Sequence, residues 1–195
     1  MALEVDGPFG STRLDPIELE GLRRPHIQTR AQLDEAEQLN IQQAHLWLSR
    51  ARPRDVLSEK FLLTVHKRMF SEVWKWAGTF RRTEKNIGCD PLQIAIRTRQ
   101  LLDDVRYWLE HKTFPPDEIG ARYHHRLVQI HLFANGNGRH ARLVVDDLLR
   151  RQGVDQLTWG EGGPISAGKV RAGYIAALRA ADARDMAPLL AFIRS

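Results

Sequence analysis

The sequence predicts an all-α fold, a helical bundle with one short β-hairpin. Apolar residues recur at three- and four-residue spacing along most of the chain, which is the period of a helix with one buried face. Short stretches rich in Pro and Gly separate these segments. The stretch over residues 76–91 lacks the helical period and is the candidate hairpin. At 195 residues, the chain suits one domain with one core.

The N-terminal residues 1–28 contain Pro and Gly without a sustained period. We therefore expect them to form an irregular lead-in to a domain over residues 29–195. The first helix is expected to begin at Thr29, a candidate N-cap, and to end at Pro53. Its apolar face would consist of Leu33, Ala36, Ile41, Ala44, Trp47 and Leu48.

A second helix is expected from Ser58, with Leu62, Val65 and Met69 on its buried face. The next segment, WAGTFRRTEKNIGCDP over residues 76–91, is polar and is punctuated by Gly and Pro. A small hairpin or flap fits this composition best.

Three further helices are expected before residue 154. The first has Asp90 as its N-cap and Pro91 at its first position. The second follows Pro115 and Pro116, and the third ends at Gly153, a candidate C-cap. Two last helices are expected over residues 167–182 and 186–194.

The composition is that of a globular protein, with 43% hydrophobic and 27% charged residues. No apolar run approaches the roughly 20 residues of a membrane span. The first residues lack the pattern of a secretory signal, so we expect a cytoplasmic protein. The single Cys89 rules out an internal disulfide, and redox chemistry is not indicated. The net charge is +5 and arginine dominates the basic residues, which favours partners that carry phosphate or carboxylate groups.

One segment interrupts the helical pattern, HLFANGNGRHAR over residues 131–142. Its glycines around Asn137 allow a left-handed backbone, so consecutive N–H groups can turn toward one anion at the start of the next helix. Arg139 and Arg142 share a face of that helix and can grip phosphate oxygens. His131 is placed to accept a proton from a hydroxyl that attacks the phosphorus. Each feature alone is common in ordinary turns and surfaces; the combination predicts a phosphate site.

This segment resembles the signature of the Fic family, H-P-F-x-[D/E]-G-N-G-R-x-x-R. The matching residues are His131, Phe133, Gly136, Asn137, Gly138, Arg139 and Arg142. Residues 76–88 are similar to the W-A-G-x-x-R flap segment of the family, and HHRLVQIH is similar to the helix that leads into the motif. The resemblance covers residues 29–155, and the first helix is similar to the branch called mobile mystery protein B.

The resemblance implies a nucleotidyltransferase (AMPylase) in which His131 would deprotonate a Ser, Thr or Tyr hydroxyl of a target protein. The oxygen would attack the α-phosphorus of the substrate ATP and release pyrophosphate. Phe133 would anchor the loop, and the phosphates would be held by Gly136, Asn137, Gly138, Arg139 and Arg142. The flap would bind the target by strand-like pairing, through Thr83, Glu84, Lys85, Asn86, Ile87 and Gly88. Such proteins are often half of a toxin and antitoxin pair, so a small antitoxin or regulator is a candidate partner.

Two positions depart from the signature. Leu132 replaces the usual Pro, which changes the stiffness of the loop rather than its chemistry. Asn135 replaces the acidic residue that the resemblance assigns to Mg²⁺. An amide oxygen can ligate Mg²⁺ but brings no charge, so weaker metal binding is expected. Weak, altered or absent adenylylation, in a catalytically decayed regulatory module, is therefore an open alternative.

Many members of the family carry an inhibitory helix with the motif [S/T]-x-x-x-E-[G/N], and this chain has no strict match. Glu37 on the first helix is the candidate inhibitory residue, with Glu35 as its competitor and Arg142 as the expected partner. The alternative is a solvent-facing glutamate on a charged helix.

Two other function classes remain open. A phosphohydrolase would hold a metal ion with His124, His125, His131 and Asp146 or Asp147. On a helix, however, His125 sits about 100° from His124, and no paired carboxylates have ligand spacing. A binding module would use the basic surface, but the sequence has no helix-turn-helix or zinc-finger pattern, so nucleic acid is not the expected partner. No membrane partner is expected either.

Overall fold

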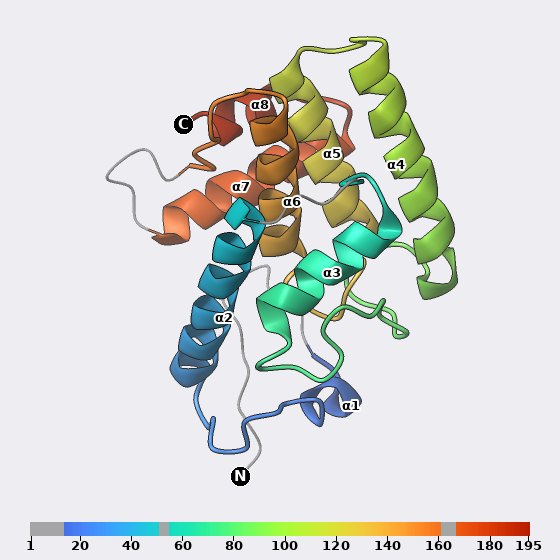
Figure 1. Ribbon diagram of the computed structural model, residues 1–195. Coiled ribbons are helices and arrows are strands. Elements are labelled where there is room, and N and C mark those ends of the chain that lie inside the picture. The colour runs from blue at the N-terminus through green and yellow to red at the C-terminus, as the bar shows by residue number, and fades with distance from the viewer. Residues whose placement is uncertain (1–13, 51–54, 161–166) are drawn as a thin grey trace.

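The computed structural model describes residues 14–50, 55–160 and 167–195, and its regular structure there is helical (Figure 1). This confirms the predicted all-α fold. The elements in chain order are α1 (Pro16–Leu19), α2 (Arg30–Arg50), α3 (Glu59–Phe70), η1 (Pro91–Gln93), α4 (Ile94–Glu110), α5 (Pro116–Ile130), α6 (Asn137–Arg151), α7 (Ala167–Asp182) and α8 (Ala187–Ile193).

The pair α5 and α6 lies at the centre of the bundle, and the loop between them carries the phosphate motif (Figure 1). Helix α4 packs on α5, and α3 packs against both α2 and α6. Helix α8 packs on α5 and pairs with α7. Fully buried residues of this core include Val65, Met69, Leu127, Val144 and Val145. Burial of one such side chain contributes about 1.5–3 kcal/mol, so the two ends of the loop are held firmly.

Local capping explains several helix boundaries that the sequence predicts. The Ser58 hydroxyl accepts a hydrogen bond from the Phe61 amide at 3.2 Å, and this N-cap starts α3. Asp90 caps the following turn by accepting from the Leu92 amide at 2.8 Å, but that turn is a 3-10 helix, and α4 begins only at Ile94. Gly153 adopts a φ of +74°, as expected of a residue that ends a helix. Pro53, the expected end of the first helix, lies outside the described residues.

The described part of the expected lead-in contains a short helix that the sequence did not predict. Helix α1 begins after Asp15, whose side chain forms a capping box with Glu18. Leu14, Leu19 and Leu22 pack against the core. A four-residue helix shows too little periodicity to be recognised in the sequence, and it is too short to be stable without its capping box and its contacts with the rest of the molecule.

The expected β-hairpin over residues 76–91 is not seen, and this segment is an irregular loop. Apart from turns at its ends, such as the one in which the Thr79 amide donates to the Trp76 carbonyl at 3.0 Å, its backbone bonds to residues at and just after the end of α5. The Arg81 amide donates to the Leu132 carbonyl at 3.0 Å, and the Cys89 amide donates to the Ile130 carbonyl at 3.3 Å. The Arg81 guanidinium donates hydrogen bonds to the carbonyl groups of Thr83 and Cys89. These donors and acceptors are therefore unavailable for a two-stranded ladder.

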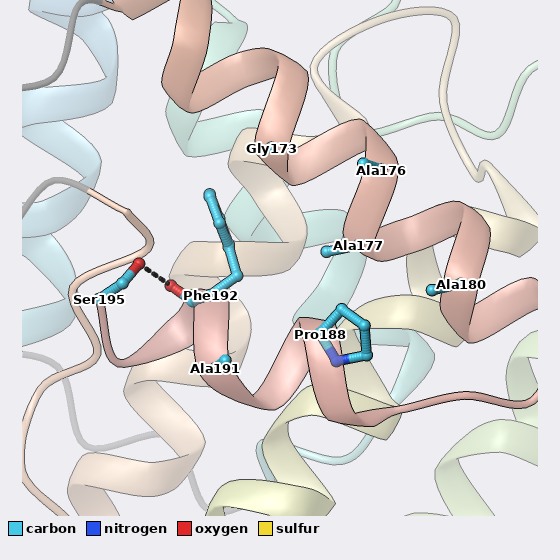
Figure 2. A pocket seen from close by; sticks show the side chains of 8 residues that line it. All are labelled: Gly173, Ala176, Ala177, Ala180, Pro188, Ala191, Phe192 and Ser195. Atoms are coloured by element: carbon cyan, nitrogen blue, oxygen red, sulfur yellow. Dashed lines mark hydrogen bonds between the residues drawn. The ribbon is translucent and has the colours of Figure 1, made fainter.

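A cavity of about 430 Å³ lies between α7 and α8 (Figure 2). It is lined by Gly173, Ala176, Ala177, Ala180, Pro188, Ala191, Phe192 and Ser195. This lining has no ionisable side chain and carries no acid, base or cation for chemistry. Within the described ranges, no helix is both long and apolar enough to cross a membrane.

Candidate active site

A larger cavity, of about 860 Å³, opens beside the loop that joins α5 to α6. The flap, helix α2 and helix α7 supply its other walls. Most of the predicted site residues lie on its surface: His131, Asn135, Gly136, Asn137, Gly138, Arg139, Arg142, Asn86, Ile87 and Gly88. The structure therefore brings the motif and the tip of the flap to one place.

The phosphate loop is closed by the side chain of Asn137. Its Oδ1 accepts from the Phe133 amide at 2.9 Å, and its Nδ2 donates to the Phe133 carbonyl at 2.8 Å. Gly136, with a φ of +80°, leads into α6, and a Cβ there would lie 2.5 Å from the Phe70 ring. The Asn137 side chain thus holds the turn, and the free N–H groups at the start of α6 remain to face an anion.

Phe133 anchors the loop as expected, because it is fully buried and stacks on His66 with ring centroids 3.6 Å apart. The Nδ1 atom of His66 accepts from the Gly78 amide at 2.9 Å, and its Nε2 donates to the Asn135 carbonyl at 3.1 Å. Burial holds the pKa of His66 well below its ordinary value, so the ring is neutral. His66 therefore links the flap to the loop, a role without any motif in the sequence.

His131 ends α5 in the left-handed conformation, with φ 58° and ψ 66°. Its side chain is buried, and burial, followed by the charge of Arg81, lowers its pKa to about 4. The imidazole is therefore neutral at pH 7, which is the form that accepts a proton. Gly88 packs directly against it, since a Cβ on Gly88 would lie 2.7 Å from the His131 Cβ.

Arg81 is the residue that fixes His131 in place, and it was not among the predicted site residues. Its Nε donates to the His131 carbonyl at 2.6 Å, and its Nη2 reaches the Ile130 carbonyl at 3.4 Å. Its other bonds hold the flap at Thr83 and Cys89. The arginine of the W-A-G-x-x-R pattern was the available signal, but the pattern alone does not show which atoms the guanidinium contacts.

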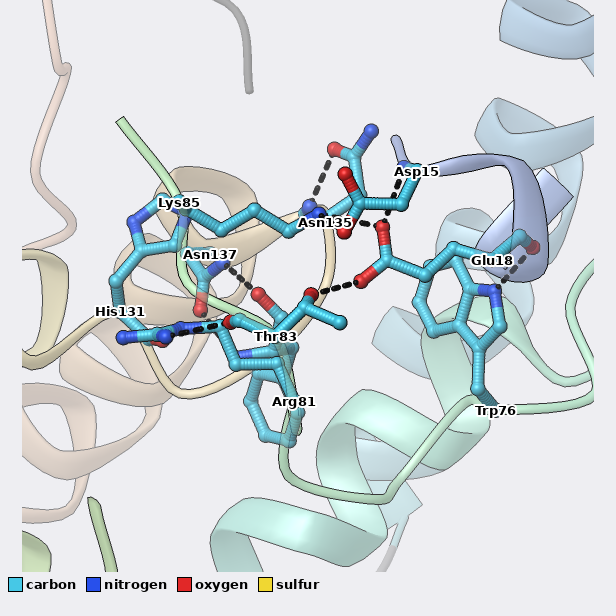
Figure 3. Close-up of polar contacts among 11 residues, drawn as sticks. Asp15, Glu18, Trp76, Arg81, Thr83, Lys85, His131, Asn135 and Asn137 are labelled. Carbon is cyan, nitrogen blue, oxygen red and sulfur yellow. Dashed lines mark hydrogen bonds and ion pairs between the residues drawn. The ribbon is translucent and has the colours of Figure 1, made fainter. Parts of the chain in front are cut away.

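Two of the predicted flap residues, Thr83 and Lys85, contact helix α1 (Figure 3) and are not among the residues that line the cavity. The Lys85 Nζ contacts Asp15 Oδ2 at 2.9 Å and Glu18 Oε2 at 2.5 Å. The Thr83 hydroxyl donates to Glu18 Oε1 at 3.0 Å. The Lys85 side chain is buried by these contacts, so Asn86, Ile87 and Gly88 form the part of the flap that lines the cavity.

Glu37 pairs with Arg139, and the expected pairing with Arg142 is wrong. Glu37 Oε2 lies 2.7 Å from Arg139 Nη1, and its Oε1 accepts from the Trp74 indole at 2.6 Å. Its residue exposure is 2%, which excludes the solvent-facing alternative, whereas the competitor Glu35 is exposed. The Trp74 indole explains why Glu37 pairs with Arg139, because it holds the Glu37 carboxylate next to that guanidinium.

Arg142 packs between aromatic rings instead. Its Cζ lies 4.8 Å from the centroid of the Tyr174 ring and 6.0 Å from that of Trp159, so cation–π contacts hold the guanidinium at the cavity wall. Tyr174 belongs to α7, and its hydroxyl bonds to His124 Nε2 at 2.8 Å. Helix α7 thus positions a motif residue, although its sequence carried no sign of this role.

The side chains expected of a phosphohydrolase metal site are held apart. His125 pairs with Asp182 at 2.8 Å, and Asp146 accepts from the Trp159 indole at 2.9 Å. Asp147 is engaged by two arginines of its own helix. Across the part of the chain that the structure describes, no three His, Cys, Asp or Glu residues are grouped to hold a metal ion.

The position expected to hold Mg²⁺ is a single neutral amide. The Oδ1 atom of Asn135 accepts from the Gly136 amide at 2.5 Å. Mg²⁺ favours carboxylate or phosphate oxygens in octahedral geometry, and one engaged amide oxygen does not supply them. These residues therefore do not fit a divalent ion held by the protein alone.

Comparison with known proteins gives the family. Residues 56–149 match the model of the Fic/DOC family. Protein adenylyltransferase Fic of Aedes aegypti is 31% identical over 147 residues, 71% of this chain and 27% of that protein. Protein adenylyltransferase fic-1 of Caenorhabditis elegans is 28% identical over 73% of this chain and 28% of that protein. The chain thus spans about a quarter of the length of these curated relatives.

Solved structures share the fold. BepC of Bartonella tribocorum, with bound AMPPNP, superposes with a TM-score of 0.70 at 18% identity, over 92% of this chain and 98% of that one. Fic-1 of C. elegans (residues 134–508) gives a TM-score of 0.66 at 24% identity, over 90% of this chain and 50% of that one. The signature loop, its buried anchor and the matching family model agree, and the chain carries a Fic/DOC family domain.

Proposed function

We propose that this chain is a protein adenylyltransferase that moves AMP from ATP to a hydroxyl side chain of a target protein. The observation that carries the proposal is the joint placement of His131, the start of α6 and Arg142 on one cavity of about 860 Å³. The names of the relatives that match this chain agree with it.

In this reaction, His131 accepts the proton of the target hydroxyl. The hydroxyl oxygen forms a bond to the α-phosphorus, the bond from that phosphorus to the bridging oxygen breaks, and pyrophosphate leaves. The neutral imidazole is ready for this step at pH 7, because its pKa lies near 4 before the nucleotide binds. The negative phosphates would raise that pKa and make the base stronger.

The start of α6 would bind the phosphates. The amide of Gly136 is occupied by the Asn135 side chain, which leaves the amides of Asn137, Gly138 and Arg139 at the helix N-terminus. The guanidinium groups of Arg139 and Arg142 would neutralise the phosphoryl oxygens as charge develops on them. Since transfer of this kind depends mainly on positioning and charge, no covalent intermediate is needed.

We propose that Mg²⁺ enters on the phosphates of ATP rather than in a site built by the protein. When bound, the ion would supply positive charge to the oxygens of the leaving group. The neutral side chain of Asn135 gives it at most one amide ligand. The proton transfer and the binding of the phosphates are both assigned to residues of this chain.

Glu37 is proposed as the inhibitory residue, acting on Arg139. Its carboxylate holds the guanidinium that a phosphate would bind. Glu37→Gly is expected to raise automodification severalfold, because it frees Arg139. Glu37→Gln tests the charge alone, since its amide oxygen can still accept from Trp74. Glu35→Gly is the matched control on the same helix, and equal rates in all three variants would remove the idea.

The function is tested by incubating the protein with ATP labelled on its α-phosphate. Labelled protein is expected, and the label should disappear in His131→Ala but persist in the exposed control His26→Ala. Release of phosphate without labelled protein would indicate a hydrolase instead. Absence of turnover, with retained binding of a partner, would indicate the decayed regulatory module.

The partners follow from this assignment. The target is proposed to be a protein with an accessible Ser, Thr or Tyr hydroxyl, bound at Asn86, Ile87 and Gly88 of the flap. A small antitoxin or regulator is proposed as a second partner, by analogy with toxin and antitoxin pairs. The proposed location is the cytoplasm.

A further inference from the structure

The cavity beside the phosphate loop carries more arginine than the motif provides. Besides Arg139 and Arg142, its wall includes Arg30 from α2 and Arg171 from α7. Arg30 is paired with Asp34 at 2.7 Å. Arg171, like Arg179 further along α7, brings a positive charge to this wall from a helix that lies outside the residues matched by the family model.

Helix α7 holds Arg171 beside the start of α6. Tyr174 is one turn further along α7, and its hydroxyl lies 3.4 Å from the position of a Cβ on Gly138. The same ring packs against the Arg142 guanidinium. Residues at i and i+3 share a helix face, so Arg171 lies on the face that Tyr174 turns toward the phosphate loop.

The positive charges of this wall repel one another. Burial lowers the pKa of Arg171, and the charges of Arg142, Arg30 and Arg139 lower it further. Such crowding of like charge costs folding free energy in the absence of a ligand. A polyanion bound among these side chains would relieve the repulsion, and arginine is the side chain best suited to grip phosphate in forked geometry.

The side chain of Asn135 is neutral, so further positive charge from the protein would be needed to balance a bound polyphosphate. A polyphosphate brings several negative charges, and the residue in the usual metal position supplies no charge to retain a divalent ion. Arg139 is already engaged by Glu37. The motif by itself thus leaves much of the phosphate charge to be neutralised by other groups.

We propose that Arg171 is a third phosphate-binding arginine, which forms with Arg139 and Arg142 a cationic cradle that holds a nucleotide polyphosphate without a protein-bound divalent ion. This inference rests on the proposed function, because it assigns the site to the substrate of that reaction. It extends the site from the motif to α7.

The test is isothermal titration of the full chain with ATP and with inorganic tripolyphosphate, each in EDTA and in Mg²⁺. The wild-type protein is expected to bind both ligands in EDTA. Arg171→Gln should weaken both by about tenfold or more, the effect of losing a charged hydrogen bond. Lys169→Gln is the matched control, since it removes the same charge from an exposed position of α7 and should change affinity less than about twofold. Thermal unfolding of both variants verifies their folds.

The outcomes separate this inference from the proposed function. Equal ATP affinity of wild-type protein and Arg171→Gln would overturn the cradle and leave the function intact, as would wild-type binding of ATP that requires Mg²⁺. A loss for ATP without a loss for tripolyphosphate would place Arg171 on the nucleoside and also overturn the cradle. If the wild-type protein binds tripolyphosphate but not ATP, and Arg171→Gln weakens the binding of tripolyphosphate, the result would support the cradle and contradict the nucleotide reaction. If the wild-type protein binds neither ligand, both proposals fail.

Discussion

Replacing Arg81 by methionine would remove the contact that fixes His131 and the flap. Methionine keeps the apolar stem and loses the guanidinium, which donates to the carbonyl groups of His131, Ile130, Thr83 and Cys89. The carbonyl groups of Thr83 and Cys89 belong to half-buried residues and can bind water instead. The carbonyl group of Ile130 keeps the Cys89 amide as a donor at 3.3 Å, whereas that of the buried residue His131 would lose the Arg81 guanidinium.

The magnitude follows from the loss of the donor to the His131 carbonyl group. Removing the hydrogen-bond partner of a buried polar group costs about 1–3 kcal/mol, so the free energy of unfolding should fall by about that amount. In a chain of this size, 1 kcal/mol shifts Tm by about 2–4 °C, which gives a decrease of about 2–12 °C. Calorimetry measures this shift. Arg82→Met, at an exposed position next in the chain, is the control.

Activity should fall further than stability alone explains. The His131 backbone has a φ of 58°, and release of its carbonyl lets the side chain leave its position. Misplacement by about 1 Å can cost a factor of about 100 in kcat. The charge of Arg81 also lowers the pKa of His131, so the acid limb of kcat/KM should move to higher pH in Arg81→Met. Unchanged Tm and kcat relative to Arg82→Met would refute this reasoning.

Two further predictions concern packing and pH. Gly88→Ala should destabilise the protein by about 1–3 kcal/mol more than Gly153→Ala and abolish labelling. The reason is that a Cβ at Gly88 would lie 2.6 Å from the Arg81 side chain, whereas a Cβ at Gly153, also at positive φ, has no atom within 4 Å. Equal Tm values for the two variants would contradict this prediction. Stability should also fall from pH 7 to pH 5, since four buried histidines with lowered pKa bind protons mainly when unfolded. Each of the three whose pKa lies near 3 or 4 costs about 2 kcal/mol at pH 5, and His66 acts in the same direction. The carboxyl of Asp146, whose pKa burial raises to about 6, offsets about 1 kcal/mol of this loss. The net loss from the groups other than His66 is roughly 5 kcal/mol, which urea unfolding measures, and a flat profile would exclude it. The four histidines are His66, His124, His131 and His140.

Apart from α1, the helices, their main boundaries and the glycine-rich loop before α6 could be predicted from the amino-acid sequence alone. Periodic apolar residues and local caps such as Ser58 act within a few residues, so their signal is present in any short window of the chain. The same holds for the loop, because Gly136 and Asn137 shape the turn through their own backbone and side-chain bonds.

Which distant side chains meet at this loop could not be predicted from the sequence, because it depends on how the helices pack. The bond from Arg81 to His131 spans 50 residues, and the pair of Glu37 and Arg139 spans 102. The flap forms no hairpin for the same reason, since its donors and acceptors find partners at the end of α5. Such contacts depend on how whole helices pack, and a linear pattern of residue types does not contain the relative position of two helices.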